Sequence, residues 1–231
     1  MRDKSMNEFI GTAAGDTIGL VVSNLDSVLQ AHMGYDTKFR AFGIIGSRTG
    51  AGGQIKAVDD AVKATNTKVL AIQLPRDTKG GGGHGNFIVI GAMDVSAARA
   101  CIEKALEYVN KNAGELYITE AGHLEFQYSA RAGEAIHKAF GSPMDKAYGF
   151  ICAAPAPIGM VIADRALKAA PVDVVTCMTP NKGTSHSNEV ILIISGESSA
   201  VYTAVREAKD NGIELLGKMG TKPTSLLTPY I

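Results

Sequence analysis

The glycine-rich turn Gly46–Gly53 contains the residues that come nearest to a nucleotide site. It lies between an expected strand and an expected helix, where the backbone N–H groups of a dinucleotide-binding fold meet a pyrophosphate. Gly50 and Gly52 match the first two glycines of that fingerprint, but Ile55 stands at the third position. The next expected strand ends in Gln73–Pro75, without the acidic residue that would bind a ribose. We therefore interpret the turn as a close backbone approach at a subunit contact, and keep a nucleotide-binding protein as an alternative.

Two loops in equivalent places of the chain carry a histidine. One consists of Lys79, Gly80, Gly81, Gly82, Gly83 and His84, and the other of Lys182, Gly183, Thr184, Ser185 and His186. No Gly-Lys-Ser or Gly-Lys-Thr follows the glycine run, so it is not a phosphate-binding P-loop. Neither loop offers cysteine, histidine or carboxylate partners at short spacing, so we expect no metal site. The glycines either let the backbone approach an axis or a ligand, or form a hairpin tip.

Polar residues accompany a repeated Ala-Gly pair. Asp16 follows Gly15, while Glu120 and His123 flank the corresponding pair Ala121-Gly122. These side chains either line a polar cavity or occupy turns, and the sequence leaves both interpretations open. The chain shows no Ser-His-Asp, Cys-His or paired-carboxylate arrangement typical of catalysis. We therefore expect a protein that is not an enzyme and that uses no cofactor.

The chain repeats itself, and the repeat sets its organisation. Asp59–Ala64 and Asp164–Ala169 lie 105 residues apart, and each is followed by a connector, an apolar run and a proline. Ala41–Ile45 and Ala147–Ile151 match in the same way, at a spacing of 106 residues. Such self-similarity indicates two tandem copies of one unit. We expect domains at residues 1–113 and 114–231.

Hydrophobic periodicity and turn residues predict the same order of elements in both halves. Each half is expected to be an α/β (α+β) unit with a small mixed or antiparallel sheet flanked by helices. The expected strands are 9–23 in segments, 42–46, 69–74, 87–90, 116–119, 124–128, 148–152, 172–178 and 190–194. The expected helices are 25–33, 54–64, 96–109, 130–140, 158–169 and 199–210, followed by an extended tail at 221–231.

Composition excludes several classes of protein. Lys plus Arg and Asp plus Glu each number 23, so no basic surplus is available for a nucleic-acid backbone or a membrane surface. Residues 1–8 are polar and lack the apolar core of a signal peptide. The three cysteines, Cys101, Cys152 and Cys177, are odd in number and lack CxxC spacing. They are expected to be buried small hydrophobes of a reducing compartment.

Several segments resemble bacterial microcompartment (BMC) shell domains. AVDDAVKATNTKVL and IADRALKAAPVDVV each resemble the helix–strand unit of that domain. Further segments resemble more narrowly the tandem-domain trimeric shell proteins of propanediol- and ethanol-utilising microcompartments. They are EFIGTAAGDTIGLVVSN, SRTGAGGQI, LPRDTKGGGGHG, EAGHLEFQYSARA, KGTSHSNEVILIISG and the final PYI. The resemblance covers nearly the whole chain.

The resemblance implies a circularly permuted BMC fold in each half and a homotrimer that mimics a hexagon. The trimer would tile with other shell proteins in the bacterial cytoplasm, with encapsulated enzymes as further partners and small-molecule metabolites in its pores. Neither a nucleic acid nor a membrane is expected as a partner. A cytosolic protein that binds a polyol or an alcohol and does not assemble into a shell is the alternative.

The resemblance also implies roles for particular residues. Lys63 and Lys168 match the lysine that lies along the edge between neighbouring tiles of the family. The loops that contain residues 79–84 and 182–186 match the segment around the central axis, where small neutral metabolites pass. Asp16, Glu120 and His123 are candidates for a small-polyol cavity between the domains. Some trimeric shell proteins hold an iron–sulfur cluster through a pore cysteine, but none of the three cysteines lies in a predicted pore loop, so no cluster is expected.

Overall fold

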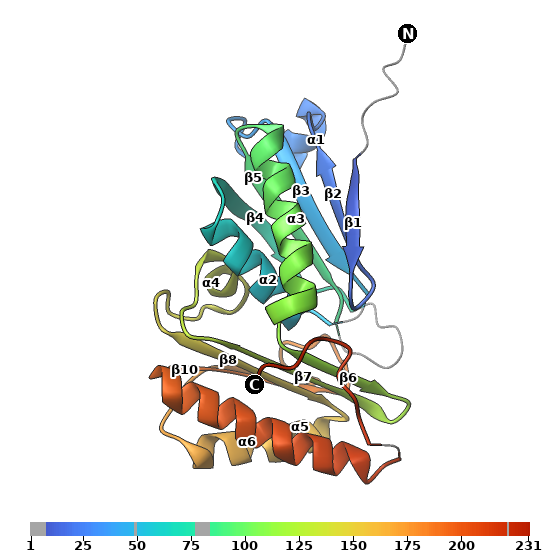
Figure 1. Ribbon diagram of the computed structural model, residues 1–231, viewed down its shortest axis with the longest axis vertical. Helices are drawn as coiled ribbons and strands as arrows, with labels where there is room; N and C mark the ends of the chain where they lie inside the picture. The colour runs from blue at the N-terminus through green and yellow to red at the C-terminus, as the bar shows by residue number, and fades with distance from the viewer. Residues whose placement is uncertain (1–7, 49, 77–83, 221) are drawn as a thin grey trace.

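The computed structural model describes residues 8–48, 50–76, 84–220 and 222–231, and it shows two five-stranded sheets with helices on their faces (Figure 1). The strand order is β1-β2-β3-β5-β4 in the first sheet and β6-β7-β8-β10-β9 in the second. All the strand pairs of both sheets are antiparallel. The prediction of two repeated α/β (α+β) units is therefore confirmed. In the described part of the chain, no helix is both long enough and apolar enough to cross a membrane.

The first half begins with a β-hairpin and ends with a long helix. Its elements are β1 (Phe9–Ala13), β2 (Thr17–Val22), α1 (Ser27–His32), β3 (Ala41–Ser47), α2 (Gly52–Lys63), β4 (Thr67–Gln73), β5 (Asn86–Ala92) and α3 (Val95–Asn112). Asp26 caps α1 by accepting from the N–H groups of Val28 and Leu29, and Asp94 caps α3 by accepting from Ala97 N–H.

The second half repeats this order with a longer final helix. Its elements are β6 (Glu115–Thr119), β7 (Gly122–Ser129), α4 (Glu134–Phe140), β8 (Ala147–Ala154), α5 (Ala156–Ala169), β9 (Asp173–Met178), β10 (Val190–Gly196) and α6 (Ser198–Gly217). α6 continues past its predicted end at residue 210. It passes through Gly212, where a methyl group would lie only 3.2 Å from Phe126 Cζ, because the helix runs close to the sheet there.

A glycine recurs at the place where the long helix of each half crosses its sheet. A methyl group at Gly43 on β3 would lie 2.8 Å from Ile102 of α3. At the equivalent Gly149 on β8 it would lie 2.7 Å from Val205 and 3.0 Å from Val201 of α6. Both glycines therefore permit a helix-to-sheet approach that any larger residue would prevent.

The second sheet is covered on both faces. Along β7, Leu124 and Phe126 alternate with His123, Glu125 and Gln127, and all five are buried. Leu124 and Phe126 belong to the core that this sheet forms with α5 and α6. The opposite face of the second sheet is turned toward the first half. Helix α2 of the first half contacts β7 and α4 of the second. In Figure 1, α4 accordingly lies beside α2, away from α5 and α6.

The predicted helix at 130–140 begins later than expected. α4 starts only at Glu134, because Ala132 N–H is bonded to Lys146 O and the chain is extended at Gly133. Gly133 has no side chain that could cap the helix, so the cap comes from another part of the fold, which is described below.

Adding a methyl group at Gly149 should destabilise the protein by roughly 1–3 kcal/mol, because the three aliphatic side chains around it have to shift in a filled core. The free energy of unfolding in denaturant measures this for Gly149→Ala. Gly220→Ala is the control, since a methyl group there would have no atom within 4 Å. Equal stability of the two variants would contradict the close helix-to-sheet packing.

Candidate functional site

The turn before α2 is filled by a carboxylate from the second half of the same chain. Glu125 Oε1 on β7 accepts hydrogen bonds of 3.1 Å from both Ala51 N–H and Gly52 N–H. A methyl group at Gly52 would lie 2.0 Å from Gln127 Oε1, so only glycine allows this approach. Burial raises the pKa of the Glu125 carboxyl, while His123 and the amide N–H groups act against that shift.

This arrangement corrects the interpretation of the turn as a subunit contact. The close approach predicted for residues 46–53 occurs between the two halves of one chain. The helix N-terminus that could have met a phosphate already binds an internal carboxylate. The nucleotide-binding alternative loses its structural basis here.

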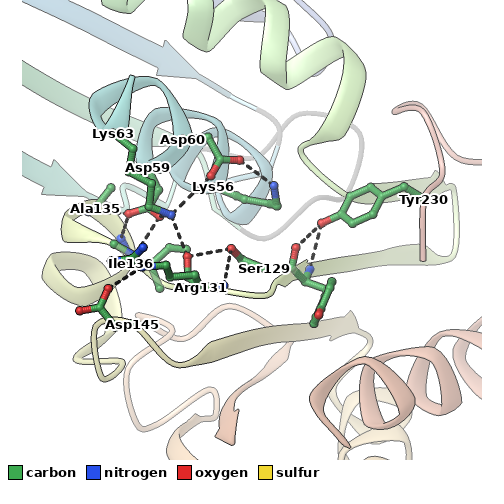
Figure 2. Close-up of polar contacts among 12 residues, drawn as sticks. Lys56, Asp59, Asp60, Lys63, Ser129, Arg131, Ala135, Ile136, Asp145 and Tyr230 are labelled. Atoms are coloured by element: carbon green, nitrogen blue, oxygen red, sulfur yellow. Dashed lines mark hydrogen bonds and ion pairs between the residues drawn. The ribbon is translucent and has the colours of Figure 1, made fainter. Parts of the chain in front are cut away.

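A second buried carboxylate joins α2 to α4 (Figure 2). Asp59 Oδ2 accepts from Gly133 N–H at 2.9 Å, and Asp59 Oδ1 accepts from Ala135 N–H at 2.9 Å and Ile136 N–H at 3.3 Å. Asp59 therefore supplies the cap that α4 lacks in its own sequence. Lys63 Nζ lies 2.7 Å from Asp59 Oδ2 and also donates to Arg131 O at 2.7 Å.

The final residues reinforce the same junction. Leu227 is buried with Ala57 and Leu116, which come from α2 and β6. The Tyr230 hydroxyl donates to Tyr128 O at 2.5 Å and accepts from Tyr128 N–H at 3.1 Å, as Figure 2 shows. The extended tail predicted from the sequence thus lies against the junction of the two halves.

The positions that α2 and β4 bury in this junction are exposed in the other copy of the unit. Ile55 is fully buried, whereas its equivalent on α5, Met160, is 54% exposed. Val69 on β4 is 1% exposed, whereas Val174 on β9 is 50% exposed. The Asp59 side chain is fully buried, while its counterpart Asp164 is 54% exposed in an ion pair with Lys168.

The opposite side of the junction shows the same contrast. Ala135 and Ile136 on α4 are fully buried, whereas the equivalent Val28 and Leu29 on α1 are 63% and 49% exposed. Glu125 pairs with Cys152 in the second sheet as Ile18 pairs with Gly46 in the first, and Ile18 is 40% exposed. The chain thus buries one junction and exposes both halves of a second one.

A cluster of ionisable side chains lies beside this junction. Glu189, which precedes β10, has Oε1 2.5 Å from His84 Nδ1 and Oε2 3.2 Å from His123 Nε2. The Cys152 thiol lies 3.5 Å from His123 Nε2 and 3.7 Å from Glu189 Oε2. All four side chains are buried. Although burial alone would raise it, the two histidines lower the pKa of Glu189 to about 2.

The cluster was not predicted, and it changes the interpretation of two residues. Cys152 was expected to be a buried hydrophobe, but it lies against polar groups. Burial and Glu189 raise its pKa well above the ordinary value. His84 is buried instead of standing free in its loop, whereas His186 is exposed. No metal site was expected because neither loop has metal-binding residues at short spacing, whereas this cluster joins residues that are distant in the sequence.

Of the two predicted pore loops, only the second lies fully within the described residues. Lys79, Gly80, Gly81, Gly82 and Gly83 lie outside the described residues, but Arg76, just before them, donates to Ser185 O at 3.4 Å. In the second loop Thr184 is buried and donates to Thr179 O, while the remaining residues are exposed. The exposed ones are Lys182, Gly183, Ser185 and His186.

The three candidates for a polyol cavity lie in different surroundings. Asp16 is exposed in the turn between β1 and β2, with φ of 52°. Glu120 is exposed in the turn between β6 and β7 and lines a cavity of about 440 Å³ together with Leu216 and Lys222. His123 belongs to the buried cluster instead, and neither it nor Asp16 is among the described residues that line this cavity.

The two predicted edge lysines differ as well. The Lys63 side chain is 35% exposed and bonded to Asp59 and to Arg131 O before α4, whereas that of Lys168 is 72% exposed and paired only with Asp164 among the described residues. A duplicated unit with one filled junction and one open one is characteristic of a protein that assembles from repeated domains.

Comparison with known proteins identifies that unit. The model of the BMC domain family matches residues 41–121 and again residues 147–222. The bacterial microcompartment shell protein PduB of Citrobacter freundii is 52% identical over 98% of this chain and 84% of its own length. The chain belongs to the BMC-domain family of bacterial microcompartment shell proteins, with two such domains in tandem.

Solved structures agree with this assignment. The crystal structure of EtuB from Clostridium kluyveri matches with a TM-score of 0.94 and 50% identity, over 98% of this chain and 100% of that one. A trimeric bacterial microcompartment shell protein PduB matches with a TM-score of 0.92 and 43% identity, over 97% and 99% of the two chains.

Replacing Asp59 with alanine should lower the free energy of unfolding by roughly 2–4 kcal/mol, because α4 loses its cap and buried N–H groups lose their acceptor. Denaturant unfolding of Asp59→Ala measures the loss. Asp210→Ala is the control, since that side chain is 61% exposed and 3.9 Å from Arg206. A loss below roughly 0.5 kcal/mol, as is usual for surface substitutions, would contradict a structural role for Asp59.

Proposed function

We propose that this chain is a non-catalytic shell tile that assembles head to tail into a homotrimer with a nearly hexagonal outline. The observation that carries the proposal is the second, open junction. Every position compared across the buried junction has an exposed equivalent, on α5 and β9 in the second half of the chain or on α1 and β2 in the first.

A neighbouring chain would fill this open junction in the way that the second half fills the first. The contact is heterologous, because two different surfaces meet, and such contacts form a ring when the rotation closes. Three chains of two units each would give six similar units. The relative PduB is described as a trimeric shell protein, which supports closure after three chains.

The exposed surfaces have the composition that such a contact needs. Met160, Val161 and Leu167 are 54%, 46% and 41% exposed on α5. Val28 and Leu29 are similarly exposed on α1. Contiguous exposed apolar side chains on a soluble protein mark an interaction surface.

The two predicted pore loops would surround passages for small neutral metabolites. Lys182, Ser185 and His186 present backbone and short or polar groups to solvent, which suits passage without chemical change. Other shell proteins and encapsulated enzymes would be the partners of the assembled tile, in a shell inside the bacterial cytoplasm. Asp16, Glu120 and His123 remain candidates for polyol binding, with Glu120 supported by the cavity that it lines.

A single charge on either exposed surface should prevent ring closure. Met160→Glu places a carboxylate in the α5 surface, and Val28→Glu places one in the α1 surface. Burying an unpaired charge costs several kcal/mol, which corresponds to a loss of affinity of about 100-fold or more. Light scattering should give three chain masses for the wild type and one for each variant.

Mixing the two variants tests whether the contact is head to tail. Each keeps one intact surface, so an equimolar mixture should form a dimer with one good contact and no trimer. Met93→Glu is the matched control, because Met93 is also 54% exposed but lies outside both surfaces. If both single variants remained trimers, the proposed contact would be wrong. A wild type that never exceeds one chain mass would favour the alternative, a polyol-binding protein that does not assemble.

We also propose that Lys63 and Lys168 contribute to the edges between tiles. Changing both to alanine should leave trimers but abolish flat ordered arrays in negative-stain images. Lys111→Ala is a suitable control, since Lys111 is an exposed helix lysine in an i,i+4 pair, like Lys168. Arrays of normal order in the double variant would refute this role.

A further inference from the structure

We propose that His123, Cys152 and Glu189 form a zinc site beside the junction, with His84 holding the carboxylate in place. Each side chain offers one ligand atom, and the three atoms all lie within 4.8 Å of one another. The site is independent of the tile surfaces, since its side chains are buried within one chain.

The separations between the ligand atoms fit a tetrahedral ion. Zinc binds nitrogen and oxygen at about 2.0–2.1 Å and sulfur at about 2.3 Å, so tetrahedral ligand atoms lie roughly 3.3–3.6 Å apart. Here His123 Nε2 is 3.2 Å from Glu189 Oε2 and 3.5 Å from Cys152 Sγ. The remaining edge, from Cys152 Sγ to Glu189 Oε2, is 3.7 Å. Little movement is needed to bring all three atoms onto one ion.

Strand register places the three side chains on one face of the second sheet. Cys152 on β8 pairs with Glu125 on β7 and with Ile191 on β10. His123 is two residues from Glu125, and Glu189 is two residues from Ile191. Because side chains alternate along a strand, all three point from the same face. A site built on adjacent strands is held more rigidly than one built on loops.

The electrostatics of the pocket favour a cation. Glu189 is 1% exposed and Glu125 is 4% exposed, so two carboxylates are buried on this face of the sheet. Buried carboxylates are normally paired with cations or coordinate metals. A divalent ion would neutralise Glu189 together with a Cys152 thiolate, whose proton would be released on binding.

His84 has the position of an outer partner. Its Nδ1 lies 2.5 Å from Glu189 Oε1, the oxygen that does not face His123 and Cys152. Groups that hold a ligating carboxylate or histidine in this way orient it toward the metal. His84 comes from the first half and the three ligands from the second, so the ion would also stabilise the junction.

The donor set selects the kind of metal. One nitrogen, one sulfur and one oxygen suit zinc, whereas calcium and magnesium require mainly oxygen ligands. Three protein ligands leave a fourth position for water. The competing interpretation is a metal-free cluster in which Glu189 is held by His84 and His123 alone.

The test is to refold the full, tag-free chain with Zn²⁺ or with a chelator and to measure bound zinc after gel filtration. We expect about one zinc per chain in the wild type. Cys152→Ser should lower the affinity at least about 100-fold, and His84→Ala about 10–100-fold, as for other outer partners. Cys101→Ser is the matched control, because Cys101 is equally buried but lies on α3, outside the cluster.

Cobalt provides an independent readout. Refolding with Co²⁺ should give a thiolate-to-cobalt absorption band in the wild type and in Cys101→Ser, but not in Cys152→Ser. Circular dichroism checks that the variants fold, and Glu189→Gln replaces Cys152→Ser if the latter does not. The site would be overturned, and the metal-free cluster established, by either of two results. The wild type could retain no zinc after refolding with Zn²⁺, or Cys152→Ser could bind zinc as tightly as the wild type. The trimer mass of the same fractions tests the tile separately.

Discussion

Two buried carboxylates accept hydrogen bonds from backbone N–H groups of helix starts, and the rest of the architecture depends on these bonds. Asp59 accepts hydrogen bonds from N–H groups at the start of α4, and Glu125 accepts them from N–H groups at the start of α2. Each helix N-terminus therefore requires a residue from the other half of the chain. Neither half can satisfy its buried backbone without the other, and this need fixes how the two units face one another.

The way the two units face one another explains why equivalent elements of the two copies have different surroundings. α2 is buried on nearly all sides, whereas α5 is buried only toward its own sheet and α6. The first residues of α1 carry their own cap in Asp26, so this helix does not depend on an acceptor from elsewhere. Of the two equivalent helices α1 and α4, the one without an internal acceptor, α1, is therefore the one that has its own cap and exposes apolar side chains.

The repeat, the order of elements along each half and most helices could be predicted, because they depend on local periodicity and on the spacing of similar segments. The order of the strands within each sheet was not predicted, since it depends on long-range pairing. The start of α4 could not, since its cap is 74 residues away in the sequence. The cluster around Glu189 could not either, because it requires the register of β7, β8 and β10 together with His84 from the other half. The clearest signal in the sequence was the presence of His123, Glu125 and Glu189 in or beside otherwise apolar strands, but only strand pairing places these residues and Cys152 on one face. The resemblance to BMC shell domains identified the family, and the exposed counterparts of buried positions came only from the structure.

The covalent link between the two units has a consequence for how a ring responds to dilution. Within each chain the second unit meets the first at a local concentration set by the connection near residue 113, independent of how much protein the cell contains. Only the joints between chains would be sensitive to abundance. The contact within a chain can also evolve residues that differ from those of the contact between chains. Glu125 in the internal contact and its exposed equivalent Ile18 already differ in this way. Tandem duplication therefore halves the number of contacts between separate chains in a six-unit ring. It also lets the contacts within chains and those between chains evolve different residues.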